Sequence, residues 1–192
     1  MKKHVLLFLA CFAFIANISA QRDETLFGKS GLGFSGAWGG WKHGITAFED
    51  ANAVTRGGYG GLEFGKKLFI GYGGFETTDD FAFGENDQSQ YDLDYNGLIL
   101  GYSPFPTKLI HPQASLLFAG GKANVRGDED RVLVVQPSLG LEMNVFQWFR
   151  LGLDGGYRFV SNSDLPETSN QDLSAFYGEF TLKFGWSWGR SR

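Results

Sequence analysis

The chain has 192 residues, 28 of them glycine, and a formal net charge of −4 at pH 7. Glycine is far above its usual share of about 7% without any collagen repeat, which is typical of crowded, curved strands. The acidic balance argues against nucleic acid as a partner. The single cysteine excludes a disulfide framework.

The first 20 residues have the three parts of a secretory signal. Lys2 and Lys3 are basic, residues 5–16 are apolar, and 18–20 read Ile-Ser-Ala, a small-residue cleavage site. We therefore predict a cleaved signal peptide at 1–20, which contains Cys11, and a short N-terminal segment at 21–30. The apolar run is too short for a transmembrane helix of roughly 20 residues, and no later run is longer, so a helical membrane protein is excluded.

Eight later segments alternate apolar and polar residues as strands do. In chain order they are 32–42, 53–64, 68–77, 91–103, 109–123, 131–143, 149–161 and 174–188. The breaks between them alternate between short (65–67, 103–108, 144–148) and longer (43–52, 76–90, 124–130, 162–173). This alternation is typical of antiparallel hairpins with short turns at one end of a sheet and long loops at the other.

The last segment alternates without a break from 176 to 188, with an apolar residue or glycine at every even position. A tilted strand that crosses a bilayer takes roughly 9 to 11 residues, and an even number of strands closes the sheet without an edge. The sequence therefore predicts an all-β fold, an eight-stranded antiparallel up-and-down transmembrane β-barrel that occupies 31–192.

The volume of the barrel interior decides which face points outward. An eight-stranded barrel is only just wide enough inside to be filled by side chains, so the large apolar set must face outward. The opposite face of the last three strands combines small residues with charges, which must be paired in a low dielectric. We predict a charge network in the lumen made of Glu142, Arg150, Asp154, Arg158, Glu179 and Lys183, with a catalytic constellation as the alternative for clustered charges.

Aromatic residues are expected to form two interfacial girdles. The girdle at the short-turn end comprises Tyr102, Phe105, Trp148, Phe149, Trp186 and Trp188. The girdle at the other end comprises Phe75, Tyr91, Tyr157, Phe159 and Phe176. The period is irregular at 62–64 and 98–100, and Pro137 lies in the middle of a strand. Bulges could absorb these irregularities, and the registers of the second and fourth strands stay open.

One acidic stretch is the candidate binding surface, because residues 68–107 contain several carboxylates and no lysine or arginine. Its candidate residues are Asp79, Asp80, Phe81, Phe83, Glu85 and Asp87. Such runs are usually solvated, and the spacing fits no calcium loop. The carboxylates with Asn86 could instead gather a divalent cation, or the stretch could present an epitope anchored by its two phenylalanines. We predict no metal and no cofactor, and the surface ligand is not identified.

The signal sequence and the final strand, with Gly178, Phe180, Leu182 and Phe184 in its pattern, resemble the small eight-stranded outer-membrane barrels of Gram-negative bacteria. That class includes the OmpA transmembrane domain and OmpX. The resemblance implies a monomer in the outer membrane with both termini periplasmic. It also implies contact with outer-membrane lipid and lipopolysaccharide, and insertion by the barrel-assembly machinery.

Membership of this class does not name a function. We expect a non-enzymatic barrel with a structural or surface-loop binding role. The alternatives are a narrow pore for passive transport of small solutes, and a lipid hydrolase built from His43 with Ser161, Ser163 or Asp164. A soluble periplasmic barrel with its apolar side chains inside is a further alternative.

Overall fold

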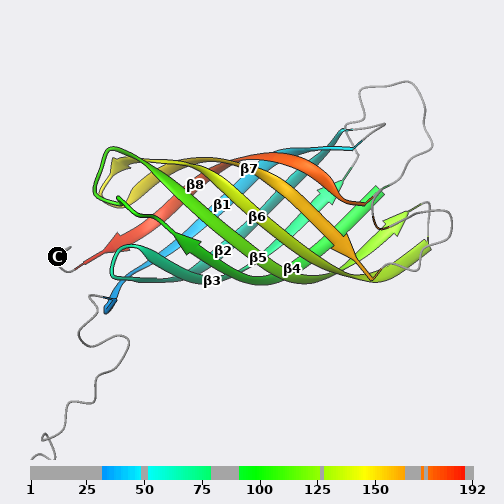
Figure 1. Ribbon diagram of the computed structural model, residues 1–192, viewed down its shortest axis with the longest axis horizontal. Helices are drawn as coiled ribbons and strands as arrows, with labels where there is room; N and C mark the ends of the chain where they lie inside the picture. Colours follow the sequence, from blue (N-terminus) through cyan, green and yellow to red (C-terminus); the bar gives the residue numbers. More distant parts are fainter. Residues whose placement is uncertain are drawn as a thin grey trace, which may run out of the picture.

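The computed structural model describes residues 32–48, 52–78, 91–125, 128–162, 170 and 173–188. Eight strands form one closed barrel in which each strand pairs antiparallel with its neighbours in sequence and β8 closes on β1 (Figure 1). The strands are β1 (Phe34–Ala47), β2 (Asn52–Phe64), β3 (Leu68–Thr78), β4 (Tyr91–Tyr102), β5 (Ile110–Val125), β6 (Asp128–Phe146), β7 (Phe149–Ser161) and β8 (Ala175–Ser187). The predicted fold class is confirmed.

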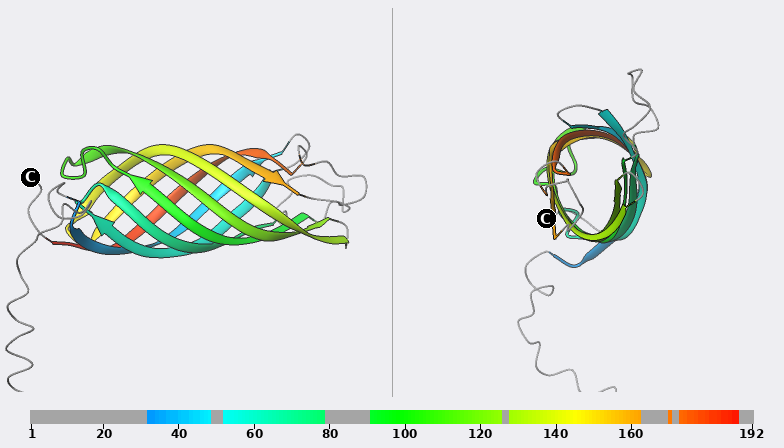
Figure 2. Two further views of the ribbon diagram at one scale, coloured as in Figure 1. Left: turned by 60° about the horizontal axis from the view of Figure 1, so that its bottom comes forward. Right: turned by 90° about the vertical axis from the view of Figure 1, so that its right-hand side faces the viewer.

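Two ends of the barrel differ in their connections. β1 begins and β8 ends beside the turns that follow β2, β4 and β6, at the left of Figure 1; we call this the turn end. β1, β3, β5 and β7 end at the opposite end of the barrel, which we call the loop end. The view along the axis in Figure 2 shows the closed ring of strands. Among the described residues, no helix is long and apolar enough to cross a membrane.

Two predicted loops are shorter than expected. β1 runs on to Ala47, because Gly44 and Thr46 continue its inward face while Ile45 continues its outward face. The predicted break at 124–130 is wrong, since β5 and β6 remain paired up to Val125 and Asp128. The Lys122 ammonium lies 2.6 Å from the Glu129 carboxylate across this hairpin.

The registers of the second and fourth strands, which the sequence left open, contain no bulge between β2 and β5. The registers of β2 with β3, β3 with β4, and β4 with β5 run without a shift. At 98–100 both faces of β4 are apolar, because Ile99 is buried in the lumen while Leu98 and Leu100 face outward. Register shifts occur instead at 34–36 in β1 and at 144–146 in β6.

Pro137 interrupts the pairing of β6 with β7 without changing its register. Paired residues resume at Ser138 and Gly156 after Val135 and Phe159, with a gap between them. Proline has no backbone N–H and cannot donate a hydrogen bond to the neighbouring strand. The unpaired residues between β6 and β7 are therefore found at the position of the proline. The strand therefore tolerates the proline without a bulge.

Large apolar side chains cover the exterior of the barrel. Leu139, Leu153 and Phe176 are 73%, 66% and 69% exposed. Soluble monomers rarely expose large continuous apolar surfaces, whereas a membrane barrel places such a band against hydrocarbon. The exterior is therefore the lipid-facing side of a transmembrane barrel, and the alternative of a soluble barrel with an apolar lumen is wrong.

The girdle residues whose exposure the structure describes lie on the exterior, except Phe75. Trp148 and Trp186 are exposed at the turn end, and Phe159 and Phe176 are exposed towards the loop end. The assignment of Phe75 to a girdle is wrong, because its side chain is 6% exposed and stacks on the ring of Tyr95 inside the barrel.

The barrel tolerates a side chain at some outward glycines and not at certain inward ones. A Cβ at Gly97 would collide with the backbone of Phe118 and Ala119, whereas a Cβ at Gly120 meets no atom within 4 Å. We expect Gly97→Ala to lower the free energy of unfolding by about 1–3 kcal/mol, as overpacking does, and Gly120→Ala to change it little. Urea titration of the refolded protein in detergent micelles measures both. Equal stability of the two variants would contradict the close strand contact at Gly97.

Candidate functional site

The lumen at the turn end is organised around Glu142. Its carboxylate lies 2.8 Å from the Lys183 ammonium and 2.9 Å from the Arg150 guanidinium, and His111 Nε2 lies 3.2 Å from Oε1. These residues come from β6, β8, β7 and β5, and each occupies an inward position of its strand. Three basic groups thus surround one buried carboxylate, which is 1% exposed.

A second group of charges lies beside the first in the middle of the barrel. The Lys42 ammonium lies 2.8 Å from Glu179 and 3.9 Å from Asp154. Asp154 also accepts a hydrogen bond of 2.6 Å from the Gln113 amide and one of 3.3 Å from the Thr181 hydroxyl. Lys42 therefore joins two strands, β7 and β8, whose carboxylates would otherwise repel each other.

Arg158 lies apart from both groups. Its side chain is fully buried, and among the described residues no carboxylate lies within ion-pair distance of its guanidinium. It donates hydrogen bonds to Gln136 Oε1 (3.0 Å), Thr77 Oγ1 (2.9 Å) and Thr55 Oγ1 (3.1 Å). The cation also lies 5.0 Å from the centre of the Tyr95 ring. Neutral oxygens and an aromatic face take the place of a counterion at this level.

The sequence interpretation omitted three members of the network: Lys42, Glu63 and His111. Glu63 accepts hydrogen bonds from Ser187 (2.7 Å) and Ser35 (3.1 Å) and lies 3.7 Å from Arg150. Lys42 and Glu63 each lie between two residues that face outward. The alternation of the sequence therefore already indicated that both side chains face inward. With these residues included, the described lumen contains four carboxylates and four cations, so its charges balance. The carboxylates are those of Glu63, Glu142, Asp154 and Glu179, and the cations are those of Lys42, Arg150, Arg158 and Lys183.

An apolar layer fills the lumen at the loop end. Leu93 and Val134 are fully buried there, and Val160 and Leu173 are 3% and 2% exposed. Near the turn end a cavity of about 50 Å³ remains, lined by charged residues that include Lys42, Arg150 and Asp154. A cavity of this size holds a few water molecules. Ion pairs, hydrogen-bonded side chains and this apolar layer thus occupy the described lumen at several levels.

The candidate hydrolase residues do not form a constellation in the described part of the chain. His43 faces outward on β1, opposite Arg56 and Phe180, and no described serine or carboxylate is hydrogen-bonded to it. His111 is buried at the turn end, where Nδ1 lies 3.1 Å from the Lys108 carbonyl oxygen. Ser163 and Asp164 lie outside the described residues.

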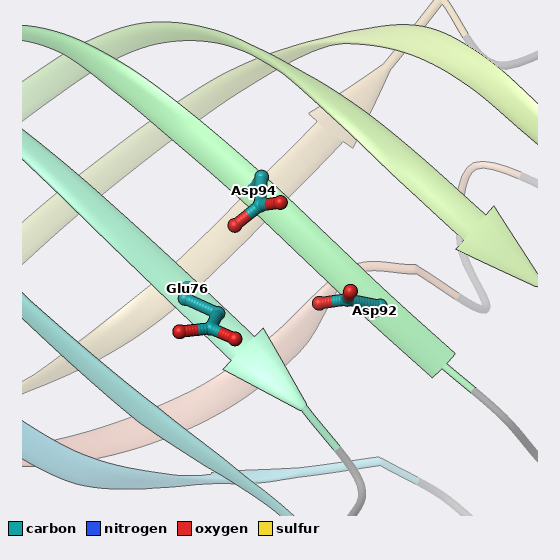
Figure 3. Close-up of side chains that lie close together, drawn as sticks. All are labelled: Glu76, Asp92 and Asp94. Atoms are coloured by element: carbon teal, nitrogen blue, oxygen red, sulfur yellow. The ribbon is translucent and has the colours of Figure 1, made fainter.

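The candidate surface-binding residues Asp79, Asp80, Phe81, Phe83, Glu85 and Asp87 also lie outside the described residues. The strands that flank them carry Glu76, Asp92 and Asp94, whose carboxylate oxygens lie within 4.8 Å of one another (Figure 3). Arg56 Nε lies 3.1 Å from Glu76 Oε2 and offsets part of this charge. The acidic character of the predicted segment thus continues onto the exterior of β3 and β4.

Comparison with known proteins identifies the fold. No protein-family model and no curated protein matches the chain. Neisserial surface protein A (NspA) is similar in structure, with a TM-score of 0.58, 11% identity, and coverage of 80% of this chain and 97% of that chain. OprG from Pseudomonas aeruginosa (TM-score 0.47, 8% identity, 83% and 98% covered) also matches. So does Ail of Yersinia pestis in complex with the heparin analogue sucrose octasulfate (0.46, 16%, 80% and 97%).

The likeness to NspA and the closed sheet together confirm the resemblance that the sequence predicted. The chain has the fold of the small eight-stranded outer-membrane barrels.

Glu142 has more basic neighbours than any other carboxylate in the described lumen. Glu142→Gln keeps the shape of the side chain but leaves Lys183 and Arg150 without their shared counterion. Removing one partner of a buried ion pair costs about 3–5 kcal/mol, so we expect a loss of that size in urea unfolding. Glu129→Gln removes the exposed partner of Lys122 and should cost at most about 1 kcal/mol. Similar losses in the two variants would show that the Glu142 cluster does not hold the barrel together.

Proposed function

We propose that the protein is a non-enzymatic barrel of the outer membrane that acts as a rigid frame for binding segments displayed at the cell surface. The observation that carries this proposal is the filled lumen. Ion pairs and hydrogen-bonded side chains occupy its centre and turn end, and an apolar layer occupies its loop end. A barrel without an open interior has its remaining chemistry on its exterior and in its connections.

The proposed orientation rests on the two longest connections, between β3 and β4 and between β7 and β8, which both belong to the loop end. In barrels of this class short turns are periplasmic and long connections face the outside, so both termini would be periplasmic. The segment between β3 and β4, which contains Asp79, Asp80, Phe81, Phe83, Glu85 and Asp87, would then lie at the cell surface. Binding residues on a rigid scaffold are concentrated in such connections. We further propose that the protein is a monomer inserted by the barrel-assembly machinery.

The two alternatives receive less support. A passive pore requires an open lumen, and the buried network and apolar layer oppose one. A lipid hydrolase requires a nucleophile beside an oriented histidine. His43 faces outward next to Arg56, without a hydrogen-bonded serine or acid among the described residues.

Epitope insertion tests the proposed orientation. A tag inserted within 79–90 should bind antibody on intact cells, whereas a tag inserted between Pro106 and Thr107 should bind only after the outer membrane is permeabilised. The turn that holds Pro106 lies at the opposite end of the barrel from the strand ends Thr78 and Tyr91, which flank the first tag. The reverse labelling pattern would contradict the orientation and remove the β3–β4 segment from the cell surface.

Planar bilayer recording tests the filled lumen. We expect the inserted protein to show no steady unitary conductance, because the ion-pair network and the apolar layer leave no aqueous path. A heat-dependent gel shift of the same sample serves as the control for a folded barrel. Regular current steps from protein that passes this control would favour the pore.

A further inference from the structure

The cavity of about 50 Å³ extends into the lumen from the turn end of the barrel. At its mouth, Lys66 and Lys67 line it from the turn after β2, and Ser103 lines it from the turn after β4. Its inner part reaches Lys42 and Asp154 of the charge network. A ligand would therefore enter this cavity between the turns and meet basic side chains first.

The lining is more basic than the lumen network requires. That network is already balanced, with four carboxylates and four cations. Lys66 and Lys67 come in addition, and no described carboxylate lies within ion-pair distance of either ammonium group. The described carboxylates of the turn end, Glu63 and Glu142, are both buried and lie near Arg150 instead. The mouth of the cavity thus carries two positive charges without a counterion from the described part of the chain.

The turn holds Lys66 beside the mouth in an unfavourable backbone conformation. The φ angle of Lys66 is 61°, in the left-handed region where glycine or asparagine is more stable than lysine. Its backbone N–H donates a hydrogen bond of 2.7 Å to Ser35 Oγ. The side chain is half-buried and also lines the adjoining hollow, as Arg150 does. Residues held in such conformations are concentrated at ligand-binding sites, so a lysine in this position indicates a ligand.

Hydrogen-bond donors with unused capacity lie further inside. The Lys183 ammonium has three N–H groups and donates to Glu142 at 2.8 Å. The Tyr59 side chain lines the cavity and packs on the Phe69 ring, with 5.7 Å between the ring centres. The Tyr59 hydroxyl forms no hydrogen bond with the described residues. The Lys183 and Tyr59 side chains can therefore donate to a bound acceptor.

The two carboxylates of the lining are engaged by other donors. Asp154 accepts hydrogen bonds from the Gln113 amide and the Thr181 hydroxyl. Glu63 accepts hydrogen bonds from two serine hydroxyls, at 2.7 and 3.1 Å. A cation that enters would first pass the two lysines of the turn, which repel it. The charges and the unused donors of this cavity therefore match an anion.

We propose that this cavity binds a free tetrahedral oxyanion of the phosphate and sulfate class. The oxygens of the anion accept hydrogen bonds from Lys66 and Lys67 at the mouth and from Lys183 and Tyr59 inside. Ammonium groups bind phosphate as point charges, through short charge-assisted hydrogen bonds. The cavity holds a few water molecules, which such an anion can replace, but it has no room for a sugar or a lipid headgroup. The site lies at the end opposite the proposed surface segments and is thus additional to the proposed function.

The test removes the charges of the turn without altering the lumen network. Lys66→Asn introduces a residue that tolerates the left-handed backbone, and Lys67→Gln removes the neighbouring charge. Lys108→Gln is the matched control, because Lys108 is an exposed lysine of another turn at the same end and does not line the cavity. Isothermal titration calorimetry of the folded protein in an uncharged detergent measures the binding of phosphate, glycerol phosphate and chloride at constant ionic strength.

We expect the double variant Lys66→Asn/Lys67→Gln to bind phosphate at least about tenfold more weakly, with Lys108→Gln unchanged. Glycerol phosphate should bind more weakly than phosphate, because it does not fit the cavity, and chloride should not displace phosphate. A unaltered protein that binds no phosphate would overturn the proposal. So would an equal loss in Lys108→Gln, or equal affinity for glycerol phosphate, since either would place the anion on the open surface. A heat-dependent gel shift of each variant confirms the folded barrel, so that a loss of binding is attributed to the site.

Discussion

The narrow interior of an eight-stranded barrel is the constraint on which the rest of this structure depends. Such a barrel is only as wide as the side chains that fill it, so every inward position must fit its neighbours in volume and in charge. Volume is balanced by glycine: a Cβ at Gly40 would lie 2.7 Å from the Tyr59 ring, and one at Gly156 would lie 2.7 Å from the Tyr177 hydroxyl. The abundance of glycine is therefore the counterpart of the large aromatic and basic side chains that close the lumen.

Charge is balanced in two different ways inside and outside the wall. Inside, carboxylates and cations contact one another directly, as Glu142 does with Lys183 and Arg150, because isolated charges are costly away from water. Outside, ionisable residues are successive cross-strand partners from β1 to β6, and the last of them, Arg131, has no described carboxylate partner. They are His43, Arg56, Glu76, Asp94, Lys122 and Arg131. The cations and carboxylates inside already contact one another, which is why we propose that recognition depends on the exterior and the connections. This division supports a scaffold with surface binding over a conduit.

Most of the fold could be predicted from the sequence, because successive residues of a strand point to opposite faces. Strict alternation of apolar and polar residues therefore indicates which residues share a face. The same rule would have placed Lys42 and Glu63 in the lumen, but the predicted network drew only on the last three strands. The partners could not be predicted in this way: Lys42 joins Glu179 and Asp154 only because β1 closes on β8. Phe75 has the phase of the buried Thr77, so the same rule would have placed it in the lumen. The extended β5–β6 hairpin brings Lys122 within 2.6 Å of Glu129, a contact that alternation does not reveal.

The orientation of two neighbouring tryptophans tests the central claim most directly. Trp41 is 57% exposed on the exterior of β1, whereas Trp38 is 2% exposed in the lumen, where the Arg150 guanidinium lies 3.9 Å from the centre of its ring. Two single-tryptophan proteins, each with the other four tryptophans replaced by phenylalanine, can be inserted into vesicles of brominated phospholipid. The fluorescence of Trp41 should be quenched by contact with the lipid, and that of Trp38 should not. Quenching of Trp38 with Trp41 unaffected would contradict the assignment of the apolar face to the membrane and of the charged face to a filled lumen.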